Sequence, residues 1–262
     1  MTREEVNTPW NPVHCQVLTS NILEALMEGR IPAVQVEPFC NANQMTLLQK
    51  AISPLSFEDY VVPPVGRVGP SHYEFRENLE KYLALSAGSK HRFEKLWSES
   101  FDVIAVVKEL LKEASGYPVE VAKSEDGHEY STCVIRKISY GALPHVDYAP
   151  YDVPDWSVGR ISHQLSWNLY VSTPDCGGEI KIYNRCWQKS DLGYREQESY
   201  AYSRDLFRDC QNVTIHVKSG DFLLINPRYY HEVIPSGPGQ NRITISSFAG
   251  LFDSSNSWVL WA

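Results

Sequence analysis

Four side chains in the second half of the sequence have types and spacing suited to redox chemistry. His145 and Asp147 are separated by one residue, His231 follows 84 positions after Asp147, and Arg242 comes 11 positions later. Two imidazoles and one carboxylate can hold Fe(II) on one face and leave open positions for reactants. Arg242 offers a planar, permanently charged fork that suits a carboxylate-bearing co-substrate. The set indicates an oxidising enzyme, with His145, Asp147 and His231 as metal ligands and catalytic residues.

The His-x-Asp pair is weak evidence by itself, because about 0.4 such pairs are expected by chance in a chain of this composition. Its surroundings supply the rest. The pair follows a predicted strand, in a loop opened by Gly141 and Pro144, while His231 and Arg242 adjoin further predicted strands. One intervening residue places both side chains of the pair on one face of an extended segment. This favours Asp147 as the carboxylate ligand over two later acidic residues, Asp152 and Asp155.

The strand that Arg242 begins also carries hydroxyl groups at alternate positions. Arg242, Thr244 and Ser246 therefore share one face. An arginine beside a hydroxyl suits the distal carboxylate of a dicarboxylate such as 2-oxoglutarate. Asn168 and Tyr170 share a face of another predicted strand and are further candidates for contact with 2-oxoglutarate.

Other polar and aromatic residues have weaker claims to a role. His163 and His216 are alternative ligands, but no partner lies at ligand spacing, which favours ordinary surface histidines. Trp156 and Trp187 in predicted loops fit either an aromatic wall or ordinary packing. The candidates for substrate contact are a pair after a Gly- and Pro-rich loop and two strand residues: His72, Tyr73, Tyr130 and Arg136.

The elements that must position these residues differ between the two halves of the chain. Residues 1–117 are predicted to be mainly helical, with Ser20 capping a helix to Gly29 and a second helix from about Asn43 to Ser53. Ser71 is expected to cap the segment after the loop 61–70. Apolar residues at steps of three and four predict one long helix over 89–115, ended by Gly116.

After residue 118, short β-branched and aromatic runs alternate with turns such as Gly177-Gly178. This pattern predicts a mainly β fold with packed helices, a double-sheet jelly roll with a helical N-terminal part. We expect one domain over 1–262, with helical support and lid in 1–117, the jelly-roll core in 118–252 and a tail in 253–262. The polar and aromatic segment 194–210 is expected to form an insertion or lid. The predicted strands cover 34–39, 130–139, 164–172, 179–183, 213–217, 221–226, 232–235 and 242–248.

Short sequence stretches over about residues 93–252 resemble a known enzyme group. The arrangement is similar to the Fe(II)/2-oxoglutarate-dependent dioxygenase superfamily, and more closely to the carrier-independent halogenases of hapalindole-type alkaloid biosynthesis. The resemblance implies a double-stranded β-helix, Fe(II) at the three ligands, 2-oxoglutarate at Arg242 with Thr244, and O2 as the oxidant. The stretches that carry it are 115–120, 135–136, 164–166, 176–180 with 183–184, 219–221, 231 and 241–244.

The sequence departs from those halogenases at one position. They carry a small residue where this chain has Asp147, which leaves a coordination position for halide. Because a carboxylate fills that position here, we expect hydroxylation of an unactivated C–H in a small molecule, with succinate and CO2 as co-products. The resemblance implies natural product biosynthesis, with a free amino acid or alkaloid-like substrate. Desaturation or cyclisation, halogenation, a protein-modifying hydroxylase and a non-catalytic metal and 2-oxoglutarate sensor remain alternatives.

Composition limits the partners and the location. A formal net charge of −8 disfavours nucleic-acid binding, which needs clustered Lys and Arg. Met1–Glu5 is charged without an apolar run behind it, and no stretch reaches the roughly 20 apolar residues of a membrane helix. Six scattered cysteines favour reduced thiols. We therefore expect a cytoplasmic enzyme with no membrane partner, while its oligomeric state stays open.

Overall fold

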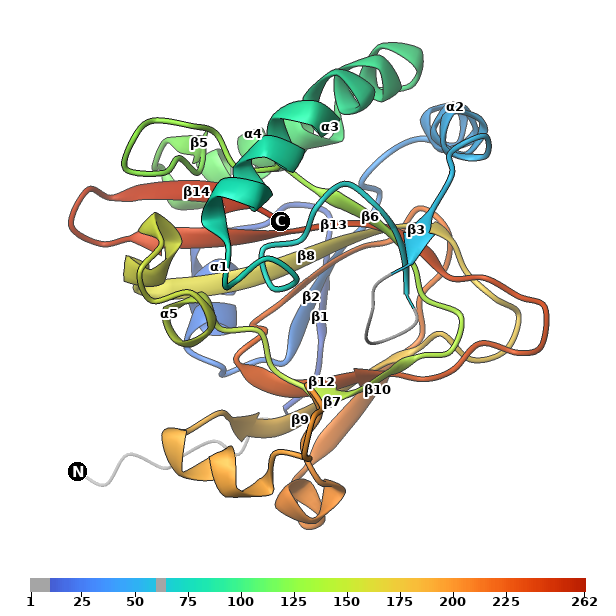
Figure 1. Ribbon diagram of the computed structural model, residues 1–262. Helices are drawn as coiled ribbons and strands as arrows, with labels where there is room; N and C mark the ends of the chain where they lie inside the picture. Colours follow the sequence, from blue (N-terminus) through green and yellow to red (C-terminus); the bar gives the residue numbers. More distant parts are fainter. Residues whose placement is uncertain (1–9, 60–64) are drawn as a thin grey trace.

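Two β-sheets form the framework of the protein (Figure 1). The computed structural model describes residues 10–59 and 65–262. The larger sheet has the order β1-β2-β11-β8-β13-β6-β4-β3, with β14 also paired to β13 and β5 paired to β14, and the smaller sheet has the order β10-β9-β12-β7. This architecture confirms the predicted jelly roll. The strands are β1 (Val13–Cys15), β2 (Ala33–Val36), β3 (Glu58–Asp59), β4 (Gly66–Val68), β5 (Val119–Val121), β6 (Val134–Lys137), β7 (Ala142–His145), β8 (His163–Ser172), β9 (Ile180–Cys186), β10 (Asn212–Ile215), β11 (Phe222–Ile225), β12 (Tyr229–Val233), β13 (Ile243–Phe252) and β14 (Ser257–Trp261).

The larger sheet separates the main hydrophobic core from the interior of the jelly roll. Along β8, Trp167 and Leu169 belong to a core cluster that also includes helix residues such as Leu26 and Leu111. Because successive side chains of a strand point to opposite faces, the β8 residues that alternate with these two point the other way. Among these, Ser166 and Asn168 line a cavity. Burial of one face against helices thus fixes which polar residues face inward.

The first two helices match the predicted segments closely. Helix α1 spans Ser20–Met27, and its N-cap is Thr19, one residue before the predicted Ser20. Helix α2 spans Ala42–Ile52 and begins with a capping box between Asn41 and Gln44. Short helical turns follow later in the chain: α5 (Ala149–Asp152), η1 (Ser157–Arg160), η2 (Lys189–Tyr194) and η3 (Arg204–Phe207).

The prediction of one long helix was wrong. The segment forms α3 (Leu79–Glu99) and α4 (Val103–Ser115), which lie on the side of the larger sheet away from the smaller one (Figure 1). Asp102 causes the break, because its side chain accepts a hydrogen bond from the Ala105 backbone N–H at 2.9 Å and starts a new helix. Gly116 ends α4 as predicted, with a φ of +74°. Helix α3 is capped by Asn78, so Ser71 is not the predicted cap.

The last ten residues form more than the expected tail. Strand β14 pairs with β13 and with β5, and Trp258 and Trp261 are fully buried. Among the described helices, none combines the length and apolar composition needed to cross a membrane. The predictions for Met1–Glu5 and for part of the loop 61–70 lie outside the described residues.

Candidate metal and co-substrate site

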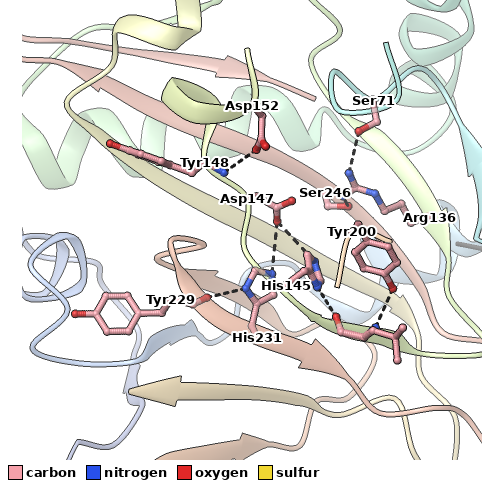
Figure 2. Close-up of polar contacts among 11 residues, drawn as sticks. Ser71, Arg136, His145, Asp147, Tyr148, Asp152, Tyr200, Tyr229, His231 and Ser246 are labelled. Carbon is pink, nitrogen blue, oxygen red and sulfur yellow. Dashed lines mark hydrogen bonds and ion pairs between the residues drawn. The ribbon is translucent and has the colours of Figure 1, made fainter. Parts of the chain in front are cut away.

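The three predicted metal ligands lie together beside two paired strands (Figure 2). His145 ends β7, Asp147 lies in the following loop, and His231 lies in β12 directly opposite His145. The Asp147 Oδ2 atom is 3.5 Å from His231 Nε2 and 3.9 Å from His145 Nε2. One donor atom from each residue lies within 4.8 Å of the others, which is a suitable cluster for one metal ion. His145 is thus in a strand rather than in the predicted loop.

Backbone carbonyl groups orient both imidazole rings. His145 Nδ1 lies 2.7 Å from the Leu143 carbonyl oxygen, and His231 Nδ1 lies 2.9 Å from the Tyr229 carbonyl oxygen. When Nδ1–H donates to these oxygens, the lone pair of each Nε2 is free for a metal. Such outer contacts fix the tautomer and orientation of metal-bound histidines. The ring centroids are 4.4 Å apart, so both rings approach the same point.

The electrostatic environment favours the ionisation states that a metal requires. Burial, followed by the nearby His231, lowers the pKa of His145 to about 4. Burial opposes ionisation of Asp147, but hydrogen bonding to His231 and the nearby His145 hold its pKa well below its usual range. His145 is therefore neutral and Asp147 ionised at neutral pH, as metal coordination demands.

Arg242 is buried beside the same cavity with much of its hydrogen-bonding capacity unused. Its side chain lies just before β13 and is 2% exposed. Nη2 donates to Tyr170 Oη at 3.1 Å, whereas Nε and Nη1 have no acceptor among the residues that the structure describes. The Thr244 hydroxyl is also buried and has no hydrogen-bond partner within residues 10–59 and 65–262. Because unpaired buried donors are costly, these atoms fit an anionic ligand, and the carboxylate of 2-oxoglutarate matches the fork.

The structure brings three of the other predicted site residues to this cavity. Asn168, Arg136 and Tyr73 line it. Tyr170 lies against Arg242, with the guanidinium carbon 4.8 Å from the ring centroid. Thr244 is paired with Tyr170 across the sheet. Arg136 donates to hydroxyl groups of Ser246 and Ser71, at 3.0 and 3.4 Å (Figure 2).

Two of the predicted substrate contacts are not at the cavity wall. Tyr130 packs against Tyr82 and Trp156 in a separate core cluster, away from the lining of this cavity. The chain is irregular at residues 130–133, and the expected alternation of a strand therefore does not apply there. His72 is buried edge-on against Phe248, which itself lines the cavity.

The structure also places the alternative candidates for metal ligand and for an aromatic wall. His163 and His216 lie near Asp253 and Glu179, outside the ligand cluster. Trp187 lines the cavity, whereas Trp156 does not. Asp152 lines the cavity without joining the ligand cluster, and the exposed Asp155 does neither.

The sequence reasoning considered Asp152 only as a rival metal ligand and missed several other residues on the cavity wall. Asp152 and its neighbours Tyr148 and Tyr151 come from α5 and the turn before it. The segment 194–210, expected as an insertion or lid, contributes Arg195, Tyr200 and Tyr202. The unusual density of aromatic and charged residues there was the available signal.

Comparison with known proteins identifies the family. Residues 12–262 match the family model described as "Carrier-protein-independent halogenase WelO5". The chain belongs to this family. It is 36% identical over 202 residues to leucinostatins biosynthesis cluster protein S of Purpureocillium lilacinum, covering 74% of this chain and 82% of that protein. It is 31% identical over 103 residues to L-gamma-glutamyl-L-propargylglycine hydroxylase of Streptantibioticus cattleyicolor, covering 39% and 37%.

Solved structures share the fold at low identity. An N-substituted L-amino acid dioxygenase from Burkholderia ambifaria aligns with a TM-score of 0.63 at 13% identity, over 93% of this chain and 91% of that chain. The epimerase SnoN from nogalamycin biosynthesis aligns with a TM-score of 0.52 at 12% identity, over 88% and 85%. Family membership, this fold and the donor set make the chain an Fe(II)- and 2-oxoglutarate-dependent oxygenase that uses O2.

Proposed function

We propose that this protein hydroxylates an unactivated C–H of a small amino acid-like or alkaloid-like molecule and releases succinate and CO2. The observation that carries the proposal is the position of Asp147. Its carboxylate lies within 4 Å of both imidazole Nε2 atoms, where the halogenases it resembles carry a small residue. A carboxylate ligand there leaves no position for halide and favours oxygen transfer.

The relatives support the substrate class. One relative is named as a hydroxylase of a γ-glutamyl amino acid, and one structural neighbour is named as a dioxygenase of N-substituted L-amino acids. A further relative is named after the biosynthesis cluster of leucinostatins. These names agree on small molecules of amino acid or natural product chemistry.

Each residue of the site takes a role that its contacts allow. His145, Asp147 and His231 hold Fe(II), which supplies activation of O2 when it is bound together with 2-oxoglutarate. Arg242 binds the distal carboxylate of 2-oxoglutarate, supported by Tyr170 and Thr244. Asn168, Tyr73 and Arg136 complete the wall that orients the reactants, by their place around the cavity. His72 supports this wall from behind Phe248.

The decisive experiment measures succinate formation from 2-oxoglutarate. We expect succinate only when Fe(II) and O2 are both present, with more of it when the true substrate is added. Asp147→Asn should abolish the reaction, because it removes the charged ligand from a cluster of three. Asp155→Asn is the matched control, since Asp155 is exposed and outside the cluster. Failure of the iron-loaded wild type to bind or consume 2-oxoglutarate would refute the proposal.

The product distinguishes hydroxylation from halogenation by the same site. In chloride buffer, mass spectrometry should show a product that gains one oxygen atom and no chlorine. A chlorine isotope pattern with Asp147 intact would show that the carboxylate does not exclude halide.

Two properties of the whole chain also remain proposals. We propose a single oxygenase domain, which predicts one cooperative unfolding transition; two separate transitions would contradict it. All six cysteines are free thiols, which supports a reducing, cytoplasmic location. Imaging of a fluorescent fusion in the source cell tests this, and a signal outside the cytoplasm would contradict it.

A further inference from the structure

Two opposite charges on the cavity wall do not pair with each other. Asp152 ends α5, and Arg195 directly follows η2. Both line the cavity that contains the three metal ligands. Within residues 10–59 and 65–262, neither side chain has an ion-pair partner within 4.0 Å. Two charged groups that face a shared cavity without a counterion are suited to a ligand that carries both charges.

Each charged group is held in place and keeps one polar atom free. Asp152 Oδ2 accepts a hydrogen bond from the Tyr148 backbone N–H at 3.0 Å (Figure 2), which leaves Oδ1 for a ligand. Arg195 Nε donates to the Ser199 carbonyl oxygen at 3.1 Å, and its Nη2 donates to Tyr73 Oη at 3.1 Å. Its Nη1 has no acceptor among the described residues. Both groups are thus ordered before a ligand arrives.

The two groups are close enough to act on the same neighbours. Burial raises the pKa of Tyr202, while Arg195 lowers it and Asp152 raises it. Burial likewise raises the pKa of Asp152 to about 7, with Asp147 adding to the rise and Arg195 and Arg76 opposing it. Asp152 therefore lies within electrostatic range of both Arg195 and the metal ligand Asp147.

Aromatic rings line the same cavity as the acidic group. Tyr148, Tyr151 and Trp187 all line the cavity. The Trp187 ring centroid is 4.8 Å from that of Tyr151 and 5.9 Å from that of Tyr148. Aromatic faces beside a carboxylate favour an ammonium group through cation–π attraction.

We propose that Asp152 and Arg195 form a subsite for the head group of a free α-amino acid. Asp152 accepts hydrogen bonds from the α-ammonium group, and Arg195 donates to the α-carboxylate. The side chain of the amino acid then extends toward His145, Asp147 and His231. An N-acylated amino acid leaves Asp152 without its cation, and an ester leaves Arg195 without its anion. This inference rests on the proposed function, because it names the substrate class of the same site.

The test is equilibrium binding by calorimetry, without O2, to the protein loaded with Fe(II) and 2-oxoglutarate. The probes are L-leucine, L-norleucine, L-phenylalanine and L-tryptophan, each as the free amino acid, its N-acetyl derivative and its methyl ester. We expect at least one free amino acid to bind about 30-fold or more tightly than both of its derivatives, since each derivative leaves one charge unpaired.

Two variants test which protein side chain binds which charged group of the amino acid. Asp152→Asn should lower the affinity for the free amino acid by about 30-fold and leave the affinity for its N-acetyl derivative unchanged. Arg195→Gln should lower the affinity for the free amino acid to a similar degree and leave the affinity for the methyl ester unchanged. Asp155→Asn is the control, because Asp155 is exposed and does not line the cavity. Unchanged affinity for 2-oxoglutarate in both variants shows that the fold and the co-substrate site are intact.

The proposed subsite for the amino acid head group is overturned if an N-acetyl derivative or ester binds as tightly as the free amino acid. It is also overturned if no free amino acid of the panel binds while 2-oxoglutarate still binds, and the proposed oxygenase function then stands. Loss of 2-oxoglutarate binding in the wild type would instead refute the proposed function.

Discussion

Replacement of Arg242 by lysine tests the co-substrate site while the positive charge is kept. Arg242 is 2% exposed, and its Nε and Nη1 atoms have no acceptor in the described part of the chain. We assign the unused donors of this guanidinium to the distal carboxylate of 2-oxoglutarate. A hydrogen bond to a charged group contributes about 1.5–3 kcal/mol. Lysine cannot present the planar fork and loses one such bond. Affinity for 2-oxoglutarate should therefore fall by about 10- to 150-fold.

The assay is a calorimetric titration of 2-oxoglutarate into the iron-loaded protein without O2. Tyr170→Phe is the graded control, because it removes only the acceptor of Arg242 Nη2. That bond is already formed without 2-oxoglutarate and the other guanidinium donors stay in place, so this variant should lose less affinity than Arg242→Lys. Wild-type affinity in Arg242→Lys, with an unchanged unfolding midpoint, would refute the assignment of the carboxylate to Arg242.

Three further predictions concern stability, measured by urea unfolding of the metal-free protein. Gly177→Ala should lower the free energy of unfolding by about 2 kcal/mol or more, because φ is +78° and an added Cβ would lie 1.9 Å from the Pro235 carbonyl oxygen. The control Gly220→Ala, with a φ of +95° and open space around the added Cβ, should lower it by only about 1–2 kcal/mol. Equal losses in the two variants would refute the steric argument. Burial lowers the pKa of His72 from 6.5 to about 4, so only the unfolded state gains a proton in this window. Stability therefore falls as the pH drops from 6.5 to 4, by up to about 3 kcal/mol, and His72→Leu should lessen this fall; parallel pH curves would contradict it. Asp102→Ala should cost about 1 kcal/mol through loss of the α4 cap, and an unchanged unfolding midpoint would count against the helix break.

The metal ligands could be predicted from the sequence because their geometry is largely local. One residue between His145 and Asp147 fixes their relative direction on an extended segment. Paired strands then bring His231 opposite His145. Arg242 was predictable for a similar reason, since an arginine at the start of a buried strand needs an anionic partner.

Other features depend on tertiary context that a single sequence does not carry. The apolar period continues through Phe101, so it gives no sign that one helix ends at Glu99 and that Asp102 caps the start of another. Tyr130 precedes β6 in an irregular segment, where strand alternation no longer predicts direction. Asp152 lies in a short helix and Arg195 in an insertion, yet both line the cavity. No periodicity in the sequence links the two positions.

The most direct test of the central claim is a crystal structure of the protein with Fe(II) and 2-oxoglutarate, prepared without O2. The account predicts one iron bound by Nε2 of His145, a carboxylate oxygen of Asp147 and Nε2 of His231. It also predicts the distal carboxylate of 2-oxoglutarate on Arg242. Iron bound without Asp147, or 2-oxoglutarate bound away from Arg242, would contradict it.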